Sequence, residues 1–431
     1  MSQPQRPQAT EPQSGIRSPH RFVLDNGIVL LVTPNLTADI IAARLFMRSG
    51  SAWEQERNAG LLNLMASLLT KGTARFSSME IAEQVESVGA GLGTDAATDY
   101  LLLSLKTVTA DFSALLNLAS EILRSPSFPP SEIELERQLT LQSIRAQKEQ
   151  PLSLAFDALR RSLYGDHPYG LSSLGTEASV ASLTQADLQA CHAQHFRPDN
   201  LIISIAGHIE PDRAQAQVEA AFGDWIAPAQ PLPSLALPPV TTQPSIVHQA
   251  QQTHQAIIML GHLAPPVHNP HYAAMKLLNT YLGNGMSSRL FVELREKQGL
   301  AYEVSTFFPT RLHSAPFGAY MGTAPENAVR AQQGLCHEVQ RLGQVRLNDE
   351  ELEATRNKLL GQYVLGKQTN SQIAQIYGWY ETLNLGIDFD ERFQAQVQAV
   401  TPEALQATAE EYFQTPHLSL VGPAETLAQL A

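Results

Sequence analysis

The feature that most constrains the fold is a segment that occurs twice, once near the middle of the chain and once at its end. The copy that begins at Thr184 reads TQADLQACHAQHFRPDNLIISIAGHIEP, and the copy at Thr401 reads TPEALQATAEEYFQTPHLSLVGPAE. In each copy a helical pattern ends at an aromatic residue, Phe196 or Phe413, and an apolar strand with a glycine follows. The two copies lie about half the chain apart, which is too far for a solenoid repeat. The sequence therefore predicts two copies of one domain of roughly 200 residues.

The composition along the chain divides it accordingly. Residues 1–20 are dominated by Gln, Pro and Ser, and residues 226–245 contain a dense run of prolines. Proline-rich segments of this kind form stiff, extended linkers. We predict a disordered tail at 1–20, an N-terminal domain at 21–225, a linker at 226–245 and a C-terminal domain at 246–431. The length of 431 residues fits two domains of this size.

Both halves alternate short strands with helices. Asn26–Gly27 between two apolar runs is a strong hairpin signal, and residues 60–71 carry the spacing of an amphipathic helix. Further strands are predicted at 40–47, 99–108, 256–263 and 301–308, and further helices at 112–123, 131–148, 271–282 and 286–297. Because the strand pairs read as hairpins, we predict an α+β fold with two duplicated domains, each a mostly antiparallel sheet covered by helices.

Charge and cysteine content exclude several classes of protein. The chain has 29 Lys and Arg against 42 Asp and Glu, a formal net charge of −13, which is the wrong sign for binding nucleic acid. It has no apolar run of the roughly 18 residues that a membrane helix needs, and residues 1–20 lack the apolar core of a secretion signal. Cys191 and Cys336 form no C-x-x-C pair. We expect a cytoplasmic protein with reduced thiols and no membrane or nucleic-acid partner.

The densest local pattern is YLGNGMSSRLFVELREKQGLAYEV in the second half. Gly283 and Gly285 predict a flexible loop, and Ser287 or Ser288 is suited to cap the helix that follows. Gly299 stands where a helix ends in a residue of positive φ. The pattern therefore predicts a loop, a short helix, a tight turn and a strand in succession.

Arg295 and Tyr302 are the candidate chemical groups of that pattern, because they flank the predicted turn. A guanidinium can anchor a substrate carbonyl or carboxylate, and a phenol can donate a hydrogen bond to a developing oxyanion. The spacing is equally typical of a surface arginine in the charge run ELREK and a tyrosine packed on a sheet. Spacing alone leaves both interpretations open.

LGNGMSSRLFVELREKQGLAYEV resembles a second-domain stretch of the insulinase/pitrilysin family of zinc metallopeptidases, in its processing-peptidase-like branch. NAGLLNLMASLLTKGT resembles the active-site helix of that family, and HPYGLSSLGT with the segment from Thr184 resembles the end of its first domain. The resemblance implies that Arg295 and Tyr302 bind substrate and assist the transition state. It also implies that the loop with Gly283, Gly285 and Ser287 borders a peptide-binding chamber.

The zinc motif expected on the active-site helix is missing. In H-x-x-E-H, two histidines bind zinc and the glutamate acts as the general base. The resemblance places Asn63 and Ser67 at the histidine positions and Ala66 at the glutamate position, all on one small, uncharged helix face. Glu134 is the candidate third ligand, with the register there open by a few residues. We therefore expect no metal in this chain.

Two other groups of histidines are candidate zinc ligands. His192 and His195 lie close together in CHAQH, and the second copy of the repeat has no histidine there. His262, His268 and His271 fall across a predicted strand end, a Pro-rich loop and a helix start. We expect structural roles for all five. The sequence also has no G-x-S-x-G and no P-loop motif.

The resemblance implies a function that fits a chain with the Arg/Tyr pair and without the zinc ligands. In heterodimeric members of the family, a zinc-bearing subunit is completed by a similar subunit that lacks the motif. We expect this chain to be such a non-zinc subunit, inactive alone, with zinc in a homologous partner and unfolded peptides as substrates. The alternative is a non-enzymatic assembly or peptide-holding homologue. A homodimer also remains possible, whereas a stand-alone peptidase would need a metal site that the sequence does not offer.

Overall fold

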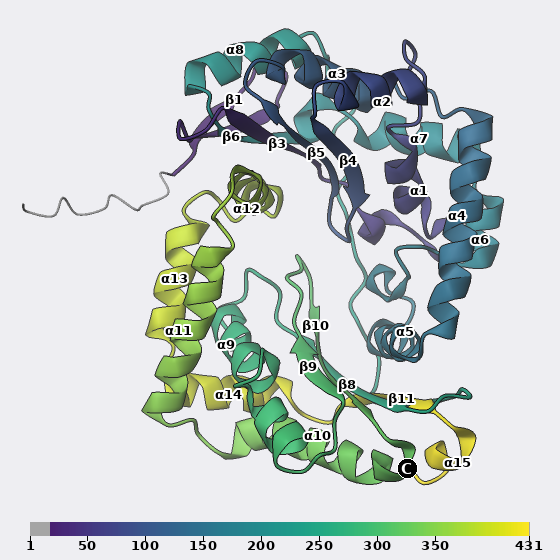
Figure 1. The fold of residues 1–431 in the computed structure, drawn as a ribbon, viewed down its shortest axis with the longest axis vertical. Coiled ribbons are helices and arrows are strands. Elements are labelled where there is room, and N and C mark those ends of the chain that lie inside the picture. The colour runs from purple at the N-terminus through teal and green to yellow at the C-terminus, as the bar shows by residue number, and fades with distance from the viewer. Residues whose placement is uncertain (1–17, 431) are drawn as a thin grey trace, which may run out of the picture.

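The computed structural model describes residues 18–430, so most of the predicted tail lies outside the described residues. The first strand, β1 (His20–Val23), begins at the last residue assigned to that tail. Figure 1 shows two halves, each a sheet with helices packed on it, one above the other. This arrangement confirms the predicted α+β fold with two duplicated domains.

The first sheet has the strand order β1-β2-β6-β3-β5-β4. Its other strands are β2 (Val29–Pro34), β3 (Ile40–Met47), β4 (Gly91–Ala96), β5 (Leu101–Val108) and β6 (Leu201–Gly207). All neighbours pair antiparallel except β2 and β6, which run parallel. Gly27 has φ 92° in the β1–β2 turn, a conformation that favours glycine. The predicted Asn-Gly hairpin is therefore confirmed.

The second sheet repeats the first without the additional strand β1. Its order is β7-β11-β8-β10-β9, and only β7 and β11 pair in parallel. The strands are β7 (Ile246–Ala250), β8 (Ala256–Ala264), β9 (Glu303–Phe307), β10 (Ala315–Thr323) and β11 (His417–Gly422). The repeated segment forms α7 (Gln185–His195) before β6 and α14 (Pro402–Tyr412) before β11. Thr184 and Thr401 cap these two helices in the same way.

Most helices stay with their own half. The first half holds α1 (Leu61–Leu68), α2 (Ser78–Glu86), α3 (Phe112–Arg124), α4 (Pro130–Glu149), α6 (Glu177–Ser182), α7 and α8 (Pro211–Phe222). The second holds α9 (Tyr272–Gly283), α10 (Ala328–Gln344), α11 (Asp349–Leu365), α13 (Phe389–Ala399), α14 and α15 (Ala424–Leu427). Residues 226–245 contain no helix or strand. None of the described helices is long and apolar enough to cross a membrane.

Two helices cross between the halves. Helix α12 (Asn370–Thr382), from the C-terminal half, packs on β3 and β6 of the first sheet, as Figure 1 shows. Helix α5 (Pro151–Tyr164), from the N-terminal half, packs on β8 and β11 of the second sheet. As a result, Phe46 and Ile202 of the first sheet share one core with residues of the C-terminal half. Each sheet thus depends on the other half to cover one of its faces.

Polar contacts fix both ends of α12 on the first half. At its start, the Asn370 side chain donates to the backbone oxygen of Ile40 at 2.9 Å. At its end, Glu381 accepts two hydrogen bonds from Arg21, at 2.8 and 3.2 Å. Arg48 donates to the Glu381 carbonyl at 3.0 Å, where the helix leaves carbonyls without helical partners. The helix is held at both ends and cannot slide on the sheet without breaking these bonds.

Gly378 allows the close approach of α12 to the sheet. A Cβ at this position would lie 2.3 Å from the ring of Phe46. We therefore expect Gly378→Ala to lower the free energy of unfolding by about 1–3 kcal/mol, because the buried ring must shift. Gly361→Ala is the matched control, since Gly361 lies in α11 with nothing within 4 Å of its Cβ position. It should raise stability by about 0.5–1 kcal/mol.

Denaturant unfolding of both variants measures this difference. Equal effects of the two substitutions would show that α12 does not pack on the sheet as described.

Candidate functional site

Helix α1 lies beside β4, the open edge strand of the first sheet. Thr94 of β4 donates its hydroxyl to the backbone oxygen of Ala66 at 2.6 Å. Ala66 is buried in the core of the first half, whereas Asn63 and Ser67 are half-buried. The Ser67 hydroxyl donates to the Asn63 carbonyl at 3.2 Å. The three predicted positions are therefore neighbours on α1, but Ala66 packs against the sheet.

The candidate third ligand, Glu134, lies on the exposed face of α4. Its carboxylate accepts hydrogen bonds from Arg137 at 3.1 Å and Gln138 at 2.7 Å. The carboxylate of α4 that approaches the end of α1 belongs to Glu136, which is buried and paired with Lys71 at 2.9 Å. Glu134 therefore satisfies its hydrogen bonds within α4, and Glu136 is the acid that faces α1.

The residues on α1 do not fit a zinc ion. A catalytic zinc takes three protein ligands with imidazole, carboxylate or thiolate donors. Asn63, Ala66 and Ser67 provide none of these, and Glu136 is committed to Lys71. Among residues 18–430, no three His, Cys, Asp or Glu side chains are placed to share a metal ion. Asn63, Ala66 and Ser67 of α1 therefore provide no metal ligand.

A buried carboxylate caps the start of α1. Glu54 accepts hydrogen bonds from the backbone N–H groups of Gly60 at 2.9 Å and Leu62 at 2.7 Å. Its side chain is almost fully buried, and burial raises the pKa of its carboxyl to about 7 despite these two bonds. Gly60 itself has φ 91°, which favours glycine. Sequence reasoning missed Glu54, because it lies six residues before the N-cap.

We expect Glu54 to make stability depend on pH. Its folded pKa of about 7 lies above the ordinary value of 4.5, so the folded state binds this proton more tightly than the unfolded state. Stability is therefore lost as the pH rises from 4.5 to 7, by about 3 kcal/mol. Glu54→Gln removes the titration, so the wild type should lose stability relative to this variant over that range. Unfolding curves that stay parallel at every pH would contradict this assignment.

Arg295 and Tyr302 flank one turn in the second half. Arg295 lies in the π-helix Phe291–Glu296, which ends where Gly299, with φ 64°, donates its N–H to the Arg295 carbonyl at 3.1 Å. Its guanidinium stacks 4.8 Å from the centre of the Phe291 ring and forms no ion pair within residues 18–430. Tyr302 precedes the edge strand β9 and is 58% exposed. Both polar groups are thus available to a ligand, and no hydrogen bond joins them.

The predicted loop is held more firmly than its glycines indicate. Gly283 ends α9 and is buried, and a Cβ there would lie 2.4 Å from the backbone nitrogen of Thr306. Gly285 has φ 79°. Lys358 of α11 donates to the Ser287 hydroxyl at 3.2 Å and to the Asn284 carbonyl. Sequence reasoning missed Lys358, because it lies more than 70 residues further along the chain in a helical charge run.

A cavity of about 280 Å³ lies between this loop, the π-helix and α11. Ser287, Arg289 and Lys358 line it together with Tyr281 and Glu351, whose side chains are joined by a hydrogen bond of 2.9 Å. Arg289 is paired with the buried Glu338. The arginine at this cavity is therefore Arg289, and neither Arg295 nor Tyr302 lines it.

The five histidines considered as metal ligands occupy structural positions in the fold. His192 bonds the Leu123 carbonyl at 2.8 Å, and His195 is buried edge-on against Trp53. His262 is buried in β8. His268 bonds the Leu383 carbonyl at 3.0 Å, and His271 precedes α9.

Both candidate elements adjoin open sheet edges. Helix α1 contacts β4, and Tyr302 leads into β9, the outermost strand of the second sheet. The exposed backbone of an edge strand can pair with an added extended chain. On β4, Gly91 and Gly93 have nothing within 4 Å of their Cβ positions, so the sheet face at these two residues is uncovered. The arrangement can hold an extended peptide.

Comparison with known proteins gives a consistent result over most of the chain. The family model described as insulinase (peptidase family M16) matches residues 30–177, and the model of the peptidase M16 inactive domain matches residues 182–359. An uncharacterized zinc protease of Streptomyces coelicolor is 26% identical over 95% of this chain and 91% of its own length. One from Bacillus subtilis is 25% identical over 94% and 98%.

Solved structures share the fold. A peptidase M16 inactive domain from Pseudomonas fluorescens superposes with a TM-score of 0.87 at 26% identity, covering 95% of this chain and 99% of that one. A protease from Helicobacter pylori gives a TM-score of 0.88 at 19% identity, covering 95% and 100%.

Proposed function

Since the chain belongs to the insulinase family, peptidase family M16, we propose that it is the non-zinc subunit of a heterodimeric zinc metallopeptidase. The observation that carries the proposal is the combination on this one chain of an active-site helix without metal ligands and an exposed, unpaired Arg295 and Tyr302. A subunit that binds metal needs ligands on α1. A subunit that only holds and polarises the peptide needs Arg295 and Tyr302 and no metal ligands.

The partner is a homologous chain that carries an intact H-x-x-E-H. It supplies both the zinc and the general base, because Asn63, Ala66 and Ser67 can supply neither. Two copies of this chain would lack both groups, so a homodimer would bind peptide without cleaving it. The two thiols, Cys191 and Cys336, are free and not exposed, which is consistent with a protein of the cytoplasm.

Unfolded peptides are the substrates that the open edges favour. An extended segment pairing with β4 or β9 is held through its backbone, which folded proteins rarely present. Arg295 would grip a backbone carbonyl of the bound segment. The Tyr302 phenol would donate a hydrogen bond to the carbonyl oxygen that gains negative charge during cleavage. Gly283, Gly285 and Ser287 would border the same chamber, with their loop fixed by Lys358.

Cleavage of a quenched fluorescent peptide library tests the proposal. It is measured with this chain alone, with its zinc-motif homologue alone and with the two mixed, together with the metal content of each. We expect activity to appear or rise sharply only on mixing, with zinc confined to the homologue. If mixing adds nothing and the two chains do not bind each other, the non-enzymatic homologue is the better account.

The two site residues should affect different kinetic constants of the mixed pair. Tyr302→Phe removes one oxyanion donor, so kcat should fall by about 100-fold. Arg295→Ala removes a charged contact to the bound peptide, so KM should rise by about tenfold or more. Lys297→Gln is the matched control, because Lys297 is an exposed cation two residues from Arg295 that pairs with Glu293.

The control should leave both constants unchanged, and the two chains should still associate in every variant. Unchanged cleavage in both site variants would mean that neither residue acts on the peptide.

A further inference from the structure

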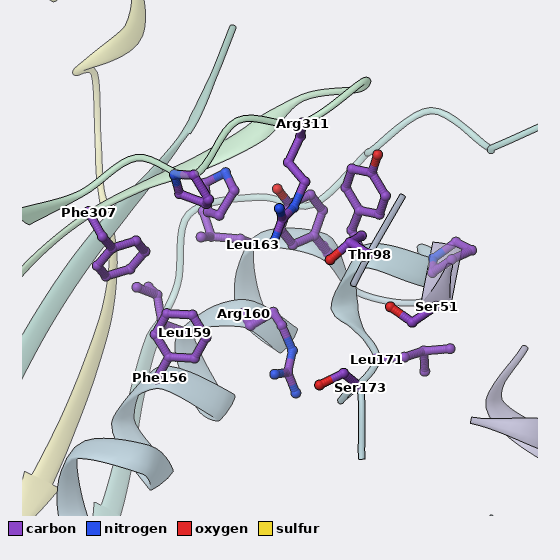
Figure 2. Close-up of a pocket in the computed structure, with 15 residues that line it drawn as sticks. Ser51, Thr98, Phe156, Leu159, Arg160, Leu163, Leu171, Ser173, Phe307 and Arg311 are labelled. Carbon is purple, nitrogen blue, oxygen red and sulfur yellow. The ribbon is translucent and has the colours of Figure 1, made fainter. Parts of the chain in front are cut away.

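A second cavity, of about 160 Å³, lies between the two halves and is lined neither by residues of α1 nor by Arg295. Helix α5 forms one wall, and the end of β9 with the loop before β10 forms another. Figure 2 shows the apolar side chains of Phe156, Leu159 and Phe307 on one side of this cavity. On the opposite side lie Ser51, Thr98 and Ser173, whose hydroxyls have no hydrogen-bond partner within residues 18–430. The cavity is therefore apolar at one end and polar at the other.

The two positive groups of this cavity are Arg160 and Arg311, which lie between these ends in Figure 2. Arg160 is already committed, because it is paired with Asp157 and donates to the Gly170 carbonyl at 3.1 Å. Arg311 donates only to the carbonyl of its neighbour Thr310, at 3.1 Å, and forms no ion pair within residues 18–430. The guanidinium of Arg311 is thus the cation without a direct ion pair, and the buried Asp99 is the acid whose charge acts on it at longer range.

The acidic side chains near the cavity are occupied by other donors. Asp99 is buried and accepts the Tyr169 hydroxyl at 2.6 Å. Asp157 also accepts from Arg161, at 3.1 Å. Neither carboxylate lines the cavity. An unpaired guanidinium next to free hydroxyls favours an anion, and its planar fork of donors matches a carboxylate.

The volume of the cavity and its apolar wall further restrict the kind of ligand that it can bind. Sites for whole small molecules measure roughly 300–1000 Å³, so this cavity takes only the end of a longer ligand. The rings of Phe156 and Phe307 lie 5.2 Å apart, one from each half of the chain. Phe156 at the aromatic end is 38% exposed and Ser173 at the polar end is exposed too, so solvent reaches both ends of the cavity. The ligand end must carry an apolar group next to its carboxylate.

We propose that this cavity binds the C-terminal residue of a peptide, with its carboxylate on Arg311 and an apolar side chain against Phe156 and Phe307. The inference rests on the proposed function in taking a peptide as the ligand. It concerns binding by this chain alone, without zinc or partner. A failed cleavage assay with the mixed subunits would not contradict peptide binding at this cavity. A failed binding assay with the isolated chain would not contradict assembly with a zinc-bearing partner.

Fluorescence polarisation of the isolated full chain tests this directly. The probe is a fluorescein-labelled Gly/Ser peptide ending in phenylalanine, prepared as the free acid and as the C-terminal amide. We expect the acid to bind roughly tenfold or more tightly than the amide, because only the acid offers a charged acceptor to Arg311. Equal affinities of the acid and the amide would overturn the proposal.

Three variants assign the effect. Arg311→Gln should abolish the preference for the acid. Arg311→Lys should keep part of it, since the ammonium keeps the positive charge but lacks the paired N–H donors of the guanidinium. Arg330→Gln is the matched control, because Arg330 is exposed on α10, forms no ion pair within residues 18–430 and carries the same charge. It should bind like the wild type. Loss of the preference in the Arg330 variant as well would overturn the assignment to Arg311.

Competition separates a peptide end from a small organic acid. Unlabelled N-acetylphenylalanine should displace the probe only at concentrations well above those of the unlabelled peptide acid. Equal potency of the two competitors would assign the cavity to a small carboxylic acid and overturn the peptide. Phe307→Ala should weaken binding of the acid and the amide alike. Unchanged binding would show that the peptide's apolar side chain does not pack against Phe307, which would overturn that part of the proposal.

Discussion

The exchange of helices between the two halves is the interaction on which the rest of the structure depends. Helix α5 covers the second sheet and α12 covers the first, so neither half can bury its apolar surface alone. Leu159 and Leu163 of α5 pack closely over Gly261 of β8, as Gly378 of α12 does over Phe46. Interiors packed this tightly resist sliding. The exchange therefore sets the positions of the two open sheet edges relative to each other.

The same framework explains how α1 keeps its place in the fold with Asn63 and Ser67 on its face. Helix α1 is held by Glu54 at its start and by the Thr94 contact along its side, and neither contact involves a metal. Asn63 and Ser67 are half-buried, so small polar side chains are tolerated there at little cost in stability. Under the proposed function, the groups that act on a peptide are Arg295, Tyr302 and the two open edges. They would bind and polarise the peptide, and the partner would cleave it.

Sequence patterns predicted much of the fold and less of the site. The repeat, the Asn26–Gly27 hairpin and the amphipathic helices were predictable because hydrophobic periodicity and turn chemistry are local. Strand β4, with the sequence GLGTDA, contains two glycines and a single β-branched residue, and the exchange of α5 and α12 depends on distant residues. Lys358 contacts a loop more than 70 residues away in sequence, Glu54 is defined by its burial, and Arg311 is defined by the lack of an ion pair within residues 18–430. Their roles depend on burial and on missing partners, which only the folded chain defines.

The central claim is that this chain holds a peptide without a metal while its partner cuts it. The most direct measurement follows peptide affinity and cleavage by the mixed pair before and after a chelator removes zinc. The account predicts that cleavage stops, while the affinity of this chain for the peptide, measured on the isolated subunit, does not change. Loss of peptide binding by the isolated chain on chelation would contradict the account, because binding would then require a metal on this chain.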